Sequence, residues 1–175
     1  MIAGYNSKPV FQYQFRPLLN DRRAPDGGFC IILYENRILS FSTYDVDGSF
    51  IDELCFSLPG KVLQCFYNLV RNAGSWLSAL PIDLRASRLT AYASSFAFDG
   101  YDPVRVWGIN ELLVEPTGTE TGFFARHLYV LFEDIGNLFA ESGIRLTLDG
   151  FTWDPSRIQP FRKSQLYSSG QLGVV

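Results

Sequence analysis

His127 is the only histidine in the sequence, and histidine is the usual general base of catalytic sites. A thiol-based catalytic scheme would use Cys30 or Cys65 as its nucleophile. Asn137 or Asp134 would then orient the imidazole. None of the local sequence signatures of catalytic cysteines accompanies these residues. We therefore expect His127 to lie at the edge of a helical apolar face with a satisfied hydrogen bond, and the chain not to be an enzyme.

Metal and cofactor motifs give no stronger candidate. The acids in segment 45–53 gather around a glycine, as in a calcium loop, but this glycine comes too early and its flanks are strand-like. The three cysteines show no CxxC spacing, and a single histidine is too few to complete a zinc site. The glycine-rich phosphate motifs GxGxxG and GxxxxGK[ST] are absent. The sequence therefore predicts a hairpin turn in segment 45–53, and neither a metal nor a cofactor.

Acidic side chains gather in two segments, one at this hairpin and one on a helix near the C-terminal end. On the helix they recur at i, i+4 and i+8, which places them along one exposed face. Such a stripe is usually a solvated surface, but it can also attract a basic partner and guide its docking. The residues predicted to contact a partner are Asp45, Asp47, Asp52, Glu53, Glu133, Asp134, Asn137 and Glu141.

Aromatic residues suggest a second kind of site. A sheet covered by two helices can leave a concave pocket between the layers, and aromatic side chains commonly line such pockets. The sequence offers Tyr92, Trp107 and Tyr129, together with His127, as its pocket candidates. They favour a small-molecule binder or an enzyme as the alternative to a protein-binding domain.

Composition limits the classes of protein. The 175 residues are long enough for one domain, which we expect to span 1–175, and a 15% aromatic content argues against disorder. A net charge of −3 disfavours a nucleic-acid surface and suits a basic protein partner. No apolar run is long enough for a membrane span, and the first residues do not resemble a secretory signal. Cytoplasmic residence is therefore expected.

Hydrophobic periodicity predicts the elements. Apolar residues at steps of three and four predict helices near 61–80 and 121–142. The alternating segment 11–15 predicts a half-buried strand. Further strands are expected at 29–34, 37–46, 49–58, 90–98, 104–114 and 145–153. Segment 82–89 reads as a polar connector, and 154–175 as a loosely attached tail.

Two stretches share the order strand, Asp-Gly turn, strand, Glu-Leu, proline, helix. Ungapped, the two helices align Gly74 with Gly136, which predicts that they cross closely at these residues; a local kink or chance is the alternative interpretation. The fold class expected is α+β: a mainly antiparallel twisted sheet of about six or seven strands with two amphipathic helices on one face, organised as two ββα pseudo-repeats. Strand–turn–strand–helix order also recurs without duplication, so a true duplication is not established.

These observations favour a non-enzymatic, intracellular binding protein. Small size, acidic charge and absent catalytic motifs suit a bacterial-style immunity or inhibitor protein that neutralises a basic toxin domain by occluding it. A subunit of a larger assembly, which exposes a sheet edge for strand addition, is the third interpretation. The sequence leaves the oligomeric state and the identity of the partner open.

Overall fold

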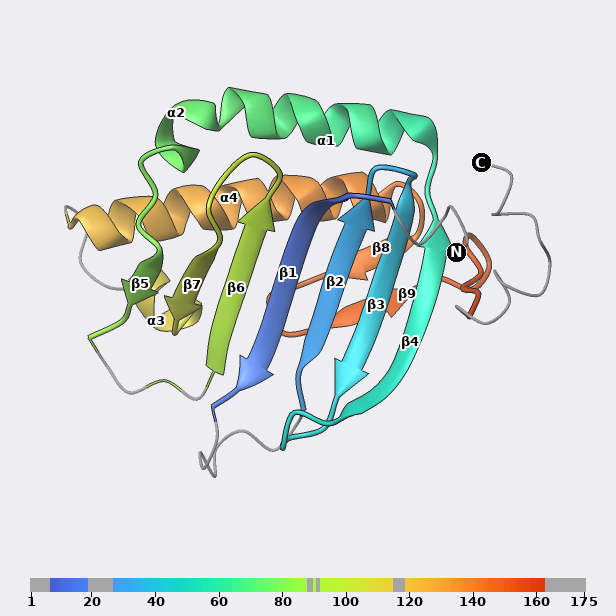
Figure 1. Ribbon diagram of the computed structural model, residues 1–175, viewed down its shortest axis with the longest axis horizontal. Helices are drawn as coiled ribbons and strands as arrows, with labels where there is room; N and C mark the ends of the chain where they lie inside the picture. The colour runs from blue at the N-terminus through green and yellow to red at the C-terminus, as the bar shows by residue number, and fades with distance from the viewer. Residues whose placement is uncertain (1–6, 19–26, 88–89, 91, 115–118, 163–175) are drawn as a thin grey trace.

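A seven-stranded sheet forms the centre of the structure, a computed structural model that describes residues 7–18, 27–87, 90, 92–114 and 119–162 (Figure 1). The strands are β1 (Pro9–Pro17), β2 (Phe29–Tyr34), β3 (Ile38–Tyr44), β4 (Phe50–Ser57), β5 (Asp83–Arg85), β6 (Tyr92–Phe98) and β7 (Val104–Trp107). Their order across the sheet is β4-β3-β2-β1-β6-β7-β5. Every neighbouring pair is antiparallel except β5 and β7. The predicted mainly antiparallel α+β fold is confirmed.

The helices and a small hairpin lie on one side of this sheet. They are α1 (Gly60–Asn72), α2 (Gly74–Leu77), α3 (Ile109–Val114), α4 (Glu120–Ala140), and the pair β8 (Ile144–Leu146) and β9 (Phe151–Trp153). In Figure 1, α4 and the β8–β9 hairpin lie behind the sheet, and α1 and α4 run in opposite directions. No helix in the described part of the chain is long and apolar enough to cross a membrane.

The helices pack on this side of the sheet because β1 places its large aromatic side chains there. Phe11, Tyr13 and Phe15 point to the same face because side chains alternate along a strand. The Phe11 ring lies 5.8 Å from that of Phe66 on α1, and the Tyr13 ring 4.6 Å from that of Phe132 on α4. Both long helices therefore pack on one face, as the amphipathic patterns predict.

Tyr13 is the polar exception at the centre of this core. Its side chain is fully buried, and its hydroxyl donates to the Leu148 carbonyl and lies 3.2 Å from Ser94 Oγ. Burial raises the pKa of this phenol well above its ordinary value, so the group remains neutral. The hydroxyl thereby ties the segment after β8 to the middle of the sheet.

Replacing Tyr13 with phenylalanine should cost about 1–3 kcal/mol of unfolding free energy, because the buried Leu148 carbonyl loses its donor. Chemical denaturation measures this directly. Tyr67→Phe, on the surface of α1, is the matched control and should change stability by less than about 0.5 kcal/mol. Equal stability of the Tyr13→Phe protein and the original would contradict the buried hydrogen bond.

Several elements differ from expectation. The helix predicted over 61–80 ends at Asn72, and α2 follows it as a separate turn. The strand predicted over 104–114 stops at Trp107, because Gly108 takes a φ of +77° and redirects the chain into α3. The connector predicted at 82–89 contains β5, whose three residues are too few to show a period. The strand predicted over 145–153 is the β8–β9 hairpin.

The predicted crossing of the helices at two glycines is wrong. Gly74 begins α2, and a Cβ built there would lie 3.1 Å from the Tyr101 hydroxyl. A Cβ on Gly136 would lie 3.4 Å from the Leu146 carbonyl oxygen of β8. Each glycine therefore faces a neighbour other than the opposite helix. The two strand–strand–helix units do occur, as β3-β4-α1 and β6-β7-α3-α4, but the second contains an extra helix.

The first part of the predicted tail contacts the sheet. Phe161 exchanges two backbone hydrogen bonds of 2.8 Å with Cys55 at the outer edge of β4. Arg162 forms an ion pair with Asp52 on the same strand. Residues 163–175 lie outside the described residues.

Candidate functional site

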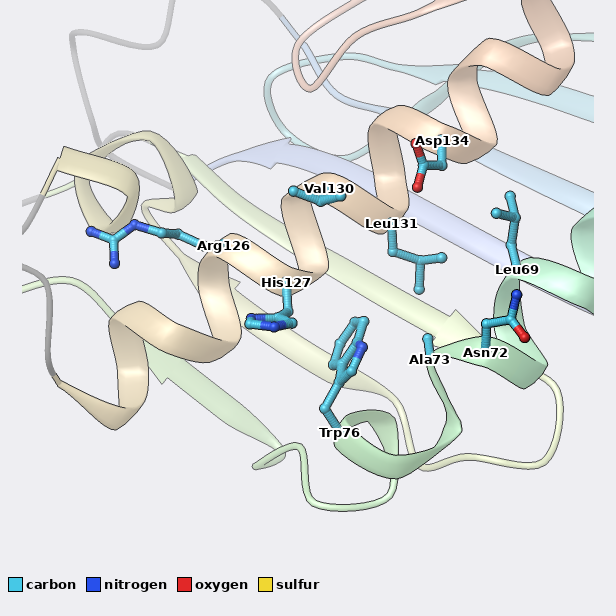
Figure 2. A pocket seen from close by; sticks show the side chains of 9 residues that line it. All are labelled: Leu69, Asn72, Ala73, Trp76, Arg126, His127, Val130, Leu131 and Asp134. Carbon is cyan, nitrogen blue, oxygen red and sulfur yellow. The ribbon is translucent and has the colours of Figure 1, made fainter.

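A groove of about 410 Å³ lies between α4 and the segment formed by α1 and α2 (Figure 2). Most of the accessible surface in it is apolar, and its charged side chains lie toward the ends. The lining residues are Leu69, Asn72, Ala73, Trp76, Arg126, His127, Val130, Leu131 and Asp134.

The groove exists because α4 extends beyond the C-terminal end of α1. Helix α1 ends at Asn72, the chain bends at Ala73, and α2 then carries Trp76 against the flank of α4. The small side chain of Ala73 leaves room at this bend. Figure 2 shows Leu131 pointing toward it from α4, with Trp76 beside the adjacent His127. The apolar floor therefore comes from two segments that only the fold brings together.

Two lining residues of the groove, His127 and Val130, belong to a face of α4 distinct from the one that faces the core. Phe123, His127 and Val130 recur at i, i+4 and i+7, so they share one helical face. We call these three residues the outer stripe. Phe123 is 48% exposed and Val130 54%, whereas the buried stripe of the same helix contains Leu128 and Leu131. Large apolar side chains are thus left open to solvent next to the groove.

His127 is held in a fixed orientation within this stripe. Its Nδ1 lies 2.8 Å from the Phe123 carbonyl oxygen, and because a carbonyl only accepts, Nδ1 carries the proton. The ring lies 4.1 Å from Phe123 and meets the edge of Trp76 at 5.6 Å. A boundary histidine with a satisfied hydrogen bond is what the sequence predicts.

The two charged residues of the groove lining, Arg126 and Asp134, lie toward opposite ends of the groove. Arg126 and Asp134 are eight residues apart, or about 12 Å along the helix axis at 1.5 Å per residue. Among the described residues, no side chain or backbone group makes an ion pair or hydrogen bond with the Asp134 carboxylate. A groove with an apolar floor and an unpaired carboxylate at one end is suited to a ligand that has an apolar group and a positive charge close to it.

The groove lining lacks the groups of a thiol-based catalytic site. No thiol, hydroxyl or amine is among the nine lining residues, so His127 has no nucleophile beside it there. Cys30 projects from the opposite face of the sheet, because its register neighbours Gln14 and Ser42 point away from the helices. Asn137 lies along the neighbouring hollow with Gly136 and Arg145. In the described part of the chain, no group of three potential ligands is placed to hold a metal.

The cysteines should therefore react at very different rates. Cys30 and Cys55 are buried, whereas Cys65 on α1 is exposed. Burial raises the pKa of the Cys30 thiol to about 11, which lowers the fraction of reactive thiolate at pH 8. A colorimetric disulfide reagent should label one thiol rapidly, and two more only after unfolding. Rapid labelling that persists in a Cys65→Ser protein would contradict this assignment.

The predicted acidic contact residues separate into two groups. On α4, Asp134 lines the groove, while Glu133 and Asn137 line the adjoining hollow. Glu141 pairs with Lys61 of α1 at 3.5 Å. All four residues are exposed, and Arg145 and Arg157 line the same hollow as Glu133 and Asn137.

The other group lies around the β3–β4 hairpin, and each of its carboxylates has a hydrogen-bond or ion-pair partner close by. Asp45 accepts from the Val46 amide at 2.7 Å. Hydrogen bonds from Ser49 lower the pKa of Asp47. Asp52 pairs with Arg162, and Glu53, on the opposite face of β4, accepts from the Ser40 hydroxyl at 2.7 Å. The hairpin acids and the α4 acids therefore do not form a single patch.

The four predicted pocket residues are not brought together either. Tyr92 stacks on Phe15 at 4.6 Å on the helix side of the sheet, while Trp107 projects from the opposite side. Tyr129 lies on the surface of α4, where a hydrogen bond to the Glu133 carboxylate raises the pKa of its phenol. Of the four, only His127 lines the groove.

The sequence predicts only His127 and Asp134 among the groove residues. The other lining residues are Leu69, Asn72, Ala73, Trp76, Arg126, Val130 and Leu131. Trp76 falls within the single helix predicted over 61–80, and the bend at Ala73 turns it toward α4 instead. Val130 lies outside the buried stripe of α4, and its apolar character there was the available signal. An extra apolar stripe on an amphipathic helix indicates a contact beyond the core.

The fold and the groove define the class of this protein as an α+β domain with a groove between two antiparallel helices. Neither a protein-family model nor a curated protein sequence matches the chain.

Proposed function

We propose that the chain is a non-enzymatic protein-binding domain that takes up an apolar, positively charged segment of a partner protein in the α1–α4 groove. The observation that carries this proposal is the outer stripe, which leaves Phe123 and Val130 about half exposed beside an apolar floor. Single exposed apolar residues need no explanation, but Phe123 and Val130 stand on either side of His127, whose ring lies 4.1 Å from that of Phe123, and this surface borders an apolar groove.

An amphipathic helix is the segment that best fits this geometry. In helix-in-groove recognition, the bound helix places apolar side chains at i, i+3 or i+4, and i+7 into a groove of its partner. Trp76 supports such a contact, because partly buried tryptophans are frequent centres of binding energy. The unpaired Asp134 at one end of the groove favours a lysine or arginine in the bound helix, one turn from its apolar residues.

The finer form of the proposal is an immunity or inhibitor protein that neutralises a toxin by occluding it. The exposed acids Glu133 and Asp134 beside the groove support a basic partner, as does the net charge of −3. Complementary charge accelerates docking and disfavours wrong partners. Occlusion requires no chemistry from the domain, in keeping with the lining of the groove.

Selection from a random-peptide display library against the whole chain tests the proposal. We expect enriched peptides with apolar residues at helical spacing and a net positive charge, with Kd values in the micromolar range. Asp134→Asn should weaken such a peptide by about 1.5- to 5-fold, since an exposed ion pair contributes about 0.2–1 kcal/mol. Asp47→Asn, which removes the same charge at the β3–β4 hairpin, outside the groove lining, should leave binding unchanged. Enrichment of acidic or apolar-free peptides would contradict the proposal.

A further inference from the structure

The face of the sheet turned away from the helices carries a cluster of arginines around one tryptophan. The register across β1, β6, β7 and β5 aligns Arg16, Ala93, Trp107 and Arg85 in one row. Arg105 projects from β7 on the same face, two residues before Trp107. All three arginines are exposed. This is the face toward the viewer in Figure 1.

Two of these guanidinium groups are oriented by the indole. The Arg85 Cζ lies 4.4 Å from the Trp107 ring centroid, and the Arg105 Cζ 5.6 Å from it. The indole is fixed in turn, because its Nε1 donates to Asp83 at 3.1 Å. A stacked guanidinium keeps its N–H donors available while losing rotational freedom. Within the described part of the chain, none of the three arginines has an ion-pair partner.

A hollow of about 40 Å³ opens between Arg16 and Arg105, which is more room than a single water needs. Its floor is Ala93 and Ser95, whose small side chains leave the space. Gln14 lines it as well, so amide and hydroxyl donors accompany the guanidinium groups. Several donors and two cations around a small polar hollow match the oxygens of a phosphate group.

A larger hollow of about 570 Å³ adjoins the first and shares Gln14 and Arg16 with it. Trp107 and Tyr44 contribute aromatic surface, and Asp45 and Asp47 lie toward its other side. This volume falls within the range of small-molecule sites. The acids disfavour an anion at their side and accept hydrogen bonds from hydroxyl or amino groups. The charge distribution thus orients a ligand with its phosphate toward the arginines.

We propose that this arginine hollow binds the phosphate of a phosphorylated small molecule, whose uncharged, hydrogen-bonding body occupies the larger hollow. The site lies on the opposite side of the sheet from the α1–α4 groove and is independent of the protein-binding proposal. A carboxylate can satisfy one guanidinium with two oxygens. A phosphate offers three terminal oxygens and can bridge two guanidinium groups, so it uses the cluster more fully.

Pyrophosphate is the probe for the test, added to the whole chain at constant ionic strength while the indole N–H signals are followed by NMR. The chain has three tryptophans, so each indole can be assigned with a Trp→Phe variant. We expect the Trp107 signal to move in a saturable way while those of Trp76 and Trp153 stay in place. Arg16→Gln and Arg105→Gln should each weaken binding at least tenfold. Arg16→Lys keeps the charge but loses the paired N–H donors of the guanidinium, so it should weaken binding to an intermediate degree.

Arg71→Gln is the control, since it removes the same charge from the surface of α1. Equal weakening by Arg71→Gln would show a general charge effect and overturn the site. A Trp107 signal that does not respond to pyrophosphate would overturn it as well. Citrate binding as tightly as pyrophosphate would overturn the assignment to phosphate.

Discussion

Replacing Phe132 with alanine should lower the free energy of unfolding by about 3–5 kcal/mol. Phe132 is 2% exposed, and its ring lies 4.6 Å from Tyr13 and 5.8 Å from Phe96. It is therefore a residue through which α4 packs on the centre of the sheet. Truncation removes this burial and leaves a cavity that the surrounding strands can fill only in part.

Val130→Ala is the matched control, because it truncates an apolar side chain of the same helix on its outer stripe. Its cost should stay below about 0.5 kcal/mol, as for most surface substitutions. Urea denaturation of both variants gives the comparison. Similar losses for the two would contradict the assignment of one stripe to the core and the other to solvent.

Val130→Asp should weaken the binding of a display-selected peptide more than tenfold while leaving stability nearly unchanged. The carboxylate would place a charge on the apolar wall of the groove, where a bound apolar side chain would have to desolvate it. Fluorescence anisotropy with a labelled peptide measures the change in Kd.

Ile82→Asp is the control for this substitution. Ile82 is 67% exposed and lies outside the groove lining, so the same charge there should leave the Kd unchanged. A loss of binding in both variants would point to a nonspecific effect of charge. Unchanged binding in Val130→Asp would remove the groove as the binding site.

The sequence predicted those parts of the fold that depend on local periodicity. The alternation of 11–15 appears within β1, and the glycines of both Asp-Gly turns take positive φ values, +88° at Gly48 and +87° at Gly100. The two long helices pack on one face because their apolar stripes require it. These features follow from side-chain spacing within one element.

The features that were missed depend on contacts between distant segments. β5 is three residues long and is a strand only because β7 pairs with it. The groove depends on where α1 ends, and Ala73 carries no helix-breaking signal of its own. Of the predicted contact residues, Asp134 lines the groove, and of the pocket candidates His127 does, because both lie on the exposed flank of α4. Trp107 and Tyr92 were assigned to one pocket, although the register places them on opposite faces.

The most direct test of the protein-binding proposal is an NMR titration of the whole chain with a display-selected basic peptide. The Trp76 indole signal and the backbone signals of 69–76 and 123–134 should move together, while the Trp107 indole signal stays in place. Shifts confined to the edge strands β4 and β5, or to Trp107, would contradict the proposed groove and indicate strand addition or binding to the open face of the sheet.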